Sequence, residues 1–196
     1  MTGERNKMQY VRGIDQYKNE KFTAITVGKF DGLHLGHEVL INRIIEHQKQ
    51  DEVDAVVLAF DMSPFYQKAN KDYKILLTNK EKAAKLEGRV DYFIDCPFDE
   101  SISRIKAEDF IKDIFVGIFH AKYIVVGSDF RFGFKRRGDA QMLKAYSSVY
   151  GYEVEVMEKK KYEGREISST FVKEELGKGN IQMAEKLLGY SYKTRK

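Results

Sequence analysis

Short apolar runs alternate along this chain with segments of helical periodicity. Five runs rich in aliphatic and β-branched residues show no strict polar alternation, which predicts buried strands. They cover residues 22–28, 54–60, 91–96, 122–128 and 152–158. Buried strands that are separated by helices are typical of a parallel sheet covered on both faces. The pattern therefore predicts a doubly wound α/β fold.

Apolar residues spaced three and four positions apart predict helices between and after these strands. The predicted helices have approximate bounds of 37–50, 79–88, 108–118, 139–150, 169–177 and 181–188. Thr78 and Glu81 form a capping box that opens one of them. Glu108 and Asp109 lie in the first turn of another, where negative charge is favourable. Gly151 is expected to end the helix before the last strand.

Composition indicates a globular protein with one folded unit. The chain has 196 residues, of which 42% are hydrophobic and 33% are charged, and no composition shift marks a second domain. We therefore expect a single domain over residues 1–196. The N-terminal segment lacks the apolar core of a secretory signal, and no apolar run approaches the ~20 residues of a membrane span. The single cysteine, Cys96, is expected to be a small buried group, and a cytoplasmic location is expected.

The residues that follow the predicted strands carry most of the unusual chemistry. These segments cover residues 28–37, 61–66, 97–100, 127–139 and 159–170. In parallel sheets of this class, ligands bind outside the carboxyl ends of the strands, near a point where the strand order reverses. We therefore expect these segments to line one site.

The segment GKFDGLHLGH has the features of an anion-binding loop. Gly28, Gly32 and Gly36 allow close approach of backbone to a ligand, and the following helix offers free N–H groups. His34 and His37 can donate hydrogen bonds to the same anion, which suits the phosphates of a nucleotide. No third ligand has suitable spacing for zinc, and the glycines match neither a Walker loop nor a dinucleotide fingerprint. The alternative is a glycine-rich turn with two incidental histidines.

This segment resembles the F-D-G-x-H-x-G-H form of the signature found in the nucleotidylyltransferase superfamily. It is most similar to the adenylyltransferase domain of bacterial FAD synthetases. Residues 125–139 resemble the G-x-D-F-x-F-G segment of that family, and residues 164–170 resemble its I-S-S-T segment. Residues 179–192 are similar to the close of the domain. The resemblance runs from about Val11 to Tyr192 and implies a Rossmann-like nucleotidylyltransferase fold.

The resemblance implies transfer of AMP from ATP to FMN, with magnesium, giving FAD and pyrophosphate. His34, His37 and Lys173 would act as the catalytic residues. Further contacts with ATP are implied for Gly28, Lys29, Phe30, Asp31, Gly36, Arg131, Ser168, Ser169 and Thr170. Contacts with FMN are implied for Asp61, Ser63, Pro64, Asp129 and Phe130, and Asp129 would also bind magnesium.

Three features depart from the family pattern. Bifunctional members continue into a riboflavin kinase domain, whereas this chain ends at Lys196, so kinase activity is not expected. Ser63 stands where the family often has a histidine. Lys173 stands where it has an arginine, and lysine keeps the charge but not the planar two-pronged contact. A solvated lysine is the alternative at position 173.

Two other functions stay open on the sequence alone. One is the same chemistry on a different phosphorylated acceptor. The other is a flavin- or nucleotide-binding module without turnover, for which the changes at Ser63 and Lys173 are the hints. The intact histidine pair favours the enzyme. The net charge of +4 is spread along the chain and does not favour a nucleic-acid partner.

The remaining polar features have structural interpretations. The basic segment 131–137 is either a solvated loop or a mobile loop that closes over phosphates. The three lysines of 159–161 are expected at a solvated surface. His47 is expected to be structural or exposed, and His120 is expected at a helix end, where a cation is favourable.

Overall fold

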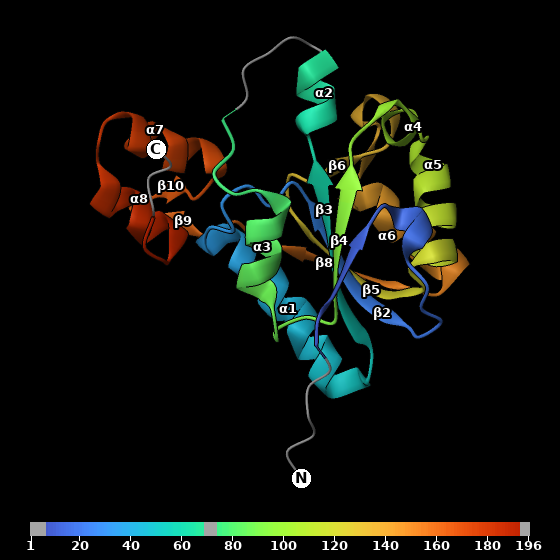
Figure 1. Ribbon diagram of the computed structural model, residues 1–196. Coiled ribbons are helices and arrows are strands. Elements are labelled where there is room, and N and C mark those ends of the chain that lie inside the picture. Colours follow the sequence, from blue (N-terminus) through green and yellow to red (C-terminus); the bar gives the residue numbers. More distant parts are fainter. Residues whose placement is uncertain (1–6, 69–73, 193–196) are drawn as a thin grey trace.

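The computed structural model describes residues 7–68 and 74–192 (Figure 1). Its centre is a six-stranded sheet in the order β1-β4-β3-β2-β5-β8, in which every neighbouring pair is parallel. The strands are β1 (Gln9–Arg12), β2 (Thr23–Gly28), β3 (Asp54–Asp61), β4 (Tyr92–Pro97), β5 (Ala121–Gly127) and β8 (Glu153–Met157). The predicted doubly wound α/β fold is confirmed.

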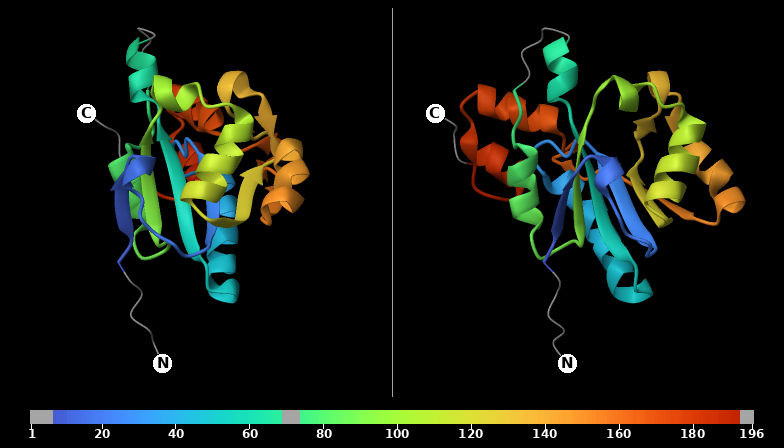
Figure 2. Two further views of the ribbon diagram at one scale, coloured as in Figure 1. Left: turned by 90° about the vertical axis from the view of Figure 1, so that its right-hand side faces the viewer. Right: turned by 45° about the vertical axis from the view of Figure 1, so that its right-hand side comes forward.

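Helices cover both faces of this sheet (Figures 1 and 2). The α-helices are α1 (Leu35–Asp51), α2 (Ser63–Lys68), α3 (Asn79–Leu86), α4 (Glu100–Ser103), α5 (Ala107–Asp109), α6 (Ala140–Tyr150), α7 (Ser169–Gly177) and α8 (Ile181–Leu188). Shorter or wider helical turns form η1 (Ile14–Gln16), η2 (Phe110–Ile118) and η3 (Phe134–Arg136). Two small hairpins pair β6 (Arg131–Phe132) with β7 (Gly138–Asp139), and β9 (Lys161–Tyr162) with β10 (Arg165–Glu166).

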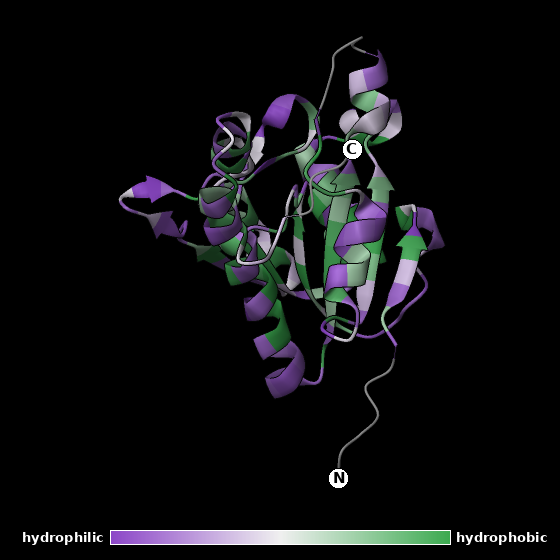
Figure 3. Ribbon diagram, turned by 60° about the vertical axis from the view of Figure 1, so that its left-hand side comes forward, coloured by the Kyte–Doolittle hydropathy of each residue, from purple (hydrophilic) through white to green (hydrophobic). Residues whose placement is uncertain are grey.

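The sheet is buried on both sides, which explains why its strands show no polar alternation. Along β3, Val56 and Leu58 belong to one hydrophobic core, while Val57 and Ala59 belong to the other. Successive strand residues point to opposite faces, so both positions must be apolar when both faces are covered. Figure 3 shows the central strands in green between helices whose outward faces are largely purple.

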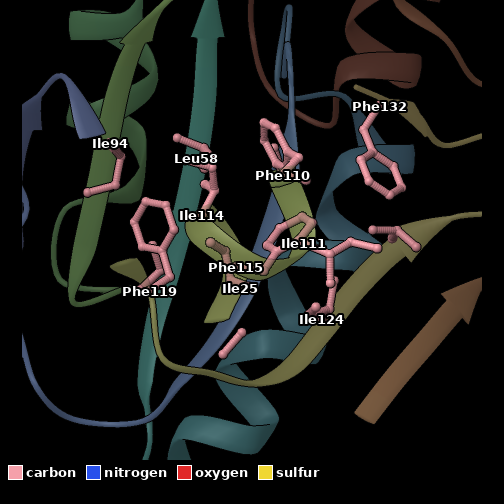
Figure 4. Close-up of a cluster of buried hydrophobic side chains, with 14 of the residues drawn as sticks. Ile25, Leu58, Ile94, Phe110, Ile111, Ile114, Phe115, Phe119, Ile124 and Phe132 are labelled. Atoms are coloured by element: carbon pink, nitrogen blue, oxygen red, sulfur yellow. The ribbon is translucent and has the colours of Figure 1, made fainter. Parts of the chain in front are cut away.

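The core beneath η2 and α6 is the more aromatic of the two (Figure 4). Phe110, Phe115 and Phe119 are at most 3% exposed and pack against the aliphatic side chains of the strands. Phe132 reaches the same core from β6. Its ring lies 5.8 Å from that of Phe110, centroid to centroid, which anchors the β6–β7 hairpin to the sheet.

Two of the larger elements differ from the prediction, and the short segments α2, α4, η1 and η3 and both hairpins were not predicted. The edge strand β1 was not predicted, because its residues are mostly exposed or half-buried and form no apolar run. The stripe over 110–118 predicted an ordinary α-helix, but η2 is π-helical, and the Phe119 N–H donates to the carbonyl of Ile114 at 3.0 Å. Both helix types place Phe110 and Ile114 on one face, so the pattern does not distinguish them.

Most other boundaries agree with the prediction. Helices α7 and α8 begin and end where they were predicted. The capping box at Thr78 is present with both of its hydrogen bonds. Helix α1 begins at Leu35, two residues before the predicted start. Within residues 7–68 and 74–192, none of the helices has the length and apolar character needed to cross a membrane.

The last two helices form a third hydrophobic cluster beside the sheet. Phe171 and Val172 of α7 pack with Leu187 and Leu188 of α8, and Leu76 joins them from the segment before α3. In Figure 1 this helix pair lies next to α3, towards the carboxyl ends of the strands. The C-terminal helices therefore lie beside the segment that leaves β2.

Candidate active site

The loop between β2 and α1, residues 29–34, lies where the strand order reverses. Strand β2 has β3 on one side and β5 on the other, so the loop leaves the sheet at the kind of point where such folds bind ligands. Phe30 and Leu33 have backbone φ values of 48° and 42°, which residues other than glycine rarely adopt. Gly32 has φ 87°, and a Cβ atom there would lie 2.6 Å from the Leu76 side chain. The loop conformation is therefore one that its surroundings must maintain.

Side chains from distant parts of the chain hold the carbonyl groups of this β2–α1 loop. The bonds are Lys82 Nζ to Lys29 O at 2.7 Å, Ser169 Oγ to Asp31 O at 2.7 Å, and Tyr190 Oη to Gly32 O at 2.6 Å. The donors belong to α3, to α7 and to the segment after α8. Because the carbonyl groups are held from outside the loop, the orientation of its peptide groups is set before any ligand arrives.

A cavity of about 470 Å³ opens beside the β2–α1 loop. The predicted site residues that line it are Lys29, Phe30, Asp31, His34, Gly36, His37, Asp129, Ser168, Ser169, Thr170 and Lys173. Tyr66, Gly127, Lys159 and Ile167 also contribute, and they belong to the segments that were expected to line the site. Leu40, Met157 and Glu158 were not predicted. The structure thus brings together loops that follow β2, β5 and β8, as expected from parallel topology.

Some of the predicted residues lie outside this cavity. Asp61 and Ser63 line a smaller cavity of about 70 Å³, which shares Lys29 and Asp31 with the larger one. Pro64 lies in α2 and lines neither cavity. Gly28 ends β2, and it too is absent from both linings.

The segment after β5 directs other predicted residues away from the cavity. The Arg131 guanidinium pairs with the Asp139 carboxylate at 2.7 Å, which closes the β6–β7 hairpin. The Phe130 ring stacks on Phe132, with centroids 5.4 Å apart. Neither side chain lines the cavity. Residues 135–137 of this basic segment are exposed.

His34 and His37 lie against each other at the start of α1. Their ring centroids are 3.7 Å apart and the rings are 19° from parallel. The Nδ1 atom of each ring is buried and finds no hydrogen-bond partner among the described residues. A Cβ atom on Gly36 would approach both the His34 ring and the Ile167 carbonyl to 3.1 Å, so glycine is needed for this close packing.

Burial keeps both imidazoles neutral. It lowers the pKa of His34 to about 4, against a smaller opposite effect of Asp31. Burial also lowers the pKa of His37 well below its ordinary value, with further lowering from His34 and Lys82. Each neutral ring carries one N–H donor. The pair can therefore hydrogen-bond a phosphate without adding formal positive charge.

The N-termini of two helices face the cavity. Helix α1 starts just after His34, and helix α7 starts just after Ser168, whose hydroxyl caps it by accepting from the Phe171 N–H at 3.2 Å. The free N–H groups and positive dipole end of a helix favour bound anions. The Ser169 hydroxyl is already bonded to the β2–α1 loop, while Thr170 is exposed. Both helices thus offer backbone donors to one ligand.

Lys173 forms an ion pair with the buried carboxylate of the site. Its Nζ atom lies 2.6 Å from Asp31 Oδ2, and the Asp31 side chain is 5% exposed. The other Asp31 oxygen accepts from the Leu76 N–H at 2.7 Å. The alternative of a solvated lysine is therefore wrong, because Lys173 is half-buried, ion-paired and part of the cavity wall.

Of the three lysines 159–161, which were expected at a solvated surface, Lys160 and Lys161 are exposed, whereas Lys159 is not. Its ammonium lies 2.9 Å from Asp129 Oδ2 and 2.8 Å from Glu166 Oε2, and it lines the cavity. These bonds raise the pKa of Lys159, with Glu166 the larger cause. A lysine run in a strand–loop segment carries no sequence signal for this arrangement.

Asp129 offers one carboxylate to a metal ion at the cavity. Its side chain is 69% exposed and is paired with Lys159. Within residues 7–68 and 74–192, no group of three or more histidine, cysteine, aspartate or glutamate residues could hold a metal. Magnesium commonly binds through one or two carboxylates together with substrate phosphates and waters. The exposed Asp129 carboxylate at the wall of this cavity fits that mode.

Lys82 is a buried cation that sequence reasoning missed. It is 4% exposed and lines the smaller cavity. Burial lowers its pKa to about 8, against the opposing effect of Asp31, Asp61 and Asp95. It stands in a polar, lysine-rich helix, where periodicity predicts a solvated face. No local signal distinguishes it from the exposed Lys80.

The other histidines and the cysteine have structural roles. His47 is buried, stacks on Tyr123 at 3.7 Å between centroids, and lies between two carboxylates. The structural interpretation of His47 is confirmed and the exposed one is wrong. His120 directly follows the cap of η2, as predicted. Cys96 is buried, and burial raises its thiol pKa to about 12, which confirms the expectation of a small buried group.

The lowered pKa of His34 predicts a specific acid sensitivity of stability. The unfolded chain binds a proton near pH 6.5, whereas the folded protein resists protonation until about pH 4. Stability from neutral His34 is therefore complete above pH 6.5 and is lost as the pH falls towards 4. Between about pH 7.5 and about pH 5 this loss is roughly 2 kcal/mol.

Urea unfolding at those two pH values checks this prediction. His34→Asn should lose less stability on acidification than the wild type, because asparagine does not titrate. His120→Asn is the matched control, since asparagine tolerates the left-handed backbone at that position (φ 46°). Equal acid losses in the wild type and both variants would contradict the prediction.

Comparisons with known proteins agree with this geometry. The family model described as FAD synthetase matches residues 16–171. Three bifunctional riboflavin kinase/FMN adenylyltransferases are similar to this chain. Those of Buchnera aphidicola (from Schizaphis graminum) and Haemophilus influenzae are each 34% identical to it, and that of Escherichia coli K12 is 32% identical. These matches cover 93%, 95% and 94% of this chain, but only 60%, 61% and 60% of those relatives.

A solved structure has a similar fold. A crystal structure described as a macrolide-efflux protein from Streptococcus pneumoniae matches with a TM-score of 0.79 and 26% identity. The match covers 93% of this chain and 62% of that one. Together with the histidine pair at the switch point of the sheet, the match over residues 16–171 shows that the chain belongs to the FAD synthetase family.

Proposed function

We propose that this protein is an FMN adenylyltransferase, which converts ATP and FMN into FAD and pyrophosphate. The observation that carries the proposal is the stacked, neutral pair His34 and His37 at the N-terminus of α1, in a cavity that the N-terminus of α7 also lines. Membership of the FAD synthetase family supports FMN as the acceptor. We further propose that residues 1–196 form one catalytic domain, which acts in the cytoplasm on small molecules and without nucleic acid.

The reaction is a displacement at phosphorus. An oxygen of the FMN phosphate forms a bond to the α-phosphorus of ATP, and the bond from that phosphorus to the bridging β-oxygen breaks. Pyrophosphate leaves with the electron pair. No covalent intermediate with the protein is needed, so the residues act by orienting the two substrates and stabilising developing charge.

The residues around the larger cavity suit the triphosphate. The imidazoles of His34 and His37 would each donate one hydrogen bond to phosphate oxygens, and the helix N-termini would add backbone donors. Lys173, positioned by Asp31, would supply positive charge. Magnesium, when bound, neutralises charge on the phosphates, and Asp129 would hold it. Binding through Asp129 requires its ion pair with Lys159 to open.

The smaller cavity suits the acceptor side. It is lined by Asp61 and Ser63 and shares Lys29 and Asp31 with the larger cavity. An acceptor bound in the smaller cavity would therefore meet the nucleotide at the wall that the two cavities share. Phe130 and Pro64, which the family resemblance places at FMN, are outside both linings. Contact of Arg131 with ATP would require its ion pair with Asp139 to break.

Incubation with ATP, magnesium and a set of acceptors tests the proposal. FMN is expected to yield FAD and pyrophosphate, detected by chromatography and mass analysis. Riboflavin, which lacks the phosphate nucleophile, is the control acceptor and should yield no adenylylated product. A product formed only with another phosphorylated acceptor would assign a different nucleotidylyltransferase. Binding of ATP and FMN without any product would assign a non-catalytic module.

A further inference from the structure

A buried ammonium group lies under the β2–α1 loop. Lys82 Nζ donates to the Lys29 carbonyl and to Asn79 Oδ1, both at 2.7 Å. Among the described residues, no carboxylate forms an ion pair with it, so both partners are neutral. Three nearby carboxylates favour the charged form of Lys82, but burial outweighs them, and they belong to Asp31, Asp61 and Asp95. Burying a charge that has no direct ion pair is costly, and an apolar side chain of similar length would fill this space at lower cost. The charge therefore points to a role other than packing.

Lys82 is itself held in position by a chain of hydrogen bonds. Asn79 Nδ2 donates to Asp95 Oδ1 at 2.6 Å, and the Tyr10 hydroxyl donates to the other Asp95 oxygen. Asp95 belongs to β4 and Tyr10 to β1, so the ammonium is tied to the rigid sheet through Asn79. A donor fixed in this way can set the geometry of the group that accepts from it.

The group it sets is the first peptide of the β2–α1 loop. In a trans peptide the carbonyl and the following N–H point in opposite directions, so the bond to Lys29 O also fixes the Phe30 N–H. Phe30 has the unfavourable φ of 48°, and both Lys29 and Phe30 line the larger cavity. Loss of this bond would allow the peptide to rotate at the wall where the two cavities meet.

We propose that Lys82 is a positioning residue for the transfer reaction, holding the Lys29–Phe30 peptide so that the β2–α1 loop presents one fixed face to the reacting phosphates. The proposal rests on the adenylyltransferase function proposed above. Lys82 does not itself contact the phosphates. Its contribution therefore belongs to the rate of transfer more than to the affinity for ATP.

The first test compares Lys82→Met with Lys80→Met in the full chain. Methionine keeps most of the buried volume but removes the charge and the donors, whereas Lys80 is exposed on the same helix. Lys82→Met is expected to lower kcat by about 10-fold while the KM for ATP and the ATP dissociation constant change by less than about 3-fold. Lys80→Met should match the wild type. Circular dichroism and Tm report whether each variant is folded.

Chemical rescue provides a second measurement that does not depend on the methionine variant folding well. Lys82→Ala lacks three carbons and the ammonium, which propylammonium can supply. Added propylammonium is expected to restore part of kcat in Lys82→Ala with saturation, and to leave Lys80→Ala unchanged. Propanol, which has similar shape but no charge, should not rescue.

The outcomes separate the two proposals. If the wild type forms no FAD from ATP and FMN, the adenylyltransferase function fails and the role of Lys82 fails with it. If the wild type is active and Lys82→Met equals Lys80→Met in kcat, only the role of Lys82 is overturned. Loss of ATP affinity in proportion to kcat, or no rescue by propylammonium, would overturn it as well, because either result indicates a general structural role.

Discussion

Replacement of His37 with alanine is expected to slow AMP transfer by about 10²–10³-fold and to change ATP affinity far less. The His37 ring stacks on His34 at 3.7 Å, and its Nδ1 atom is buried without a partner among the described residues. A donor in such a water-poor site acts most strongly on charge that develops during the reaction. Rapid-quench measurement of FAD formation, beside calorimetric titration of ATP, separates the two effects.

His47→Ala is not a suitable control, because His47 joins two carboxylates and its loss would disturb the fold. His120→Asn is the better control and should keep the wild-type rate. His37→Asn, which retains an amide donor, is expected to fall between the alanine variant and the wild type. Unchanged turnover in both His34→Ala and His37→Ala would favour the alternative interpretation, in which the segment is a glycine-rich turn with incidental histidines.

Replacement of Lys173 with alanine is expected to lower the rate by about 10²-fold and to destabilise the fold by about 1–3 kcal/mol. The ammonium lies 2.6 Å from the Asp31 carboxylate, which is 5% exposed, so its removal takes away a close counter-charge from a buried anion. Lys173→Arg should keep substantial activity, because the charge survives and only the geometry of contact changes. Steady-state rates and urea unfolding measure the two effects.

The double variant Lys173→Ala/Asp31→Asn distinguishes catalysis from stability. Asparagine keeps an oxygen for the Leu76 N–H but removes the buried negative charge. The double variant is expected to recover most of the lost stability and little of the lost rate. Full recovery of the rate would mean that Lys173 serves only to neutralise Asp31, and that other groups stabilise the phosphates.

The fold was predictable because its strands are buried on both faces. Runs such as 54–60 and 122–128 can satisfy two hydrophobic cores only in a parallel sheet between helices. Edge strand β1 gave no such signal, since half of its surroundings is solvent and its stability comes from backbone pairing with β4. The hydrophobic pattern of a sequence reflects which residues are buried, so it gives the weakest signal for an element that is mostly exposed.

The candidate site was predictable where chemistry and backbone geometry coincide. The spacing of Gly36 between two histidines has a local cause, because a Cβ atom at that position would crowd the His34 ring. Lys82 and Lys159 were missed because their roles depend on partners far along the chain, at Lys29, Asp129 and Glu166. A charged residue on a polar segment has the same local pattern whether it faces solvent or a buried carbonyl.

The hydrogen bonds that hold the β2–α1 loop have a consequence for the timing of biosynthesis. The donors to Lys29, Asp31 and Gly32 lie 53, 138 and 158 residues further along the chain. A growing polypeptide can therefore form β2 and α1 early, but it cannot complete the loop until Tyr190 has been made and has docked. Contacts of such large separation are among the last that a chain closes. Nucleotide-binding competence is then expected to arise only after Tyr190 has been synthesised, and with it the protection of a nascent chain by bound ATP.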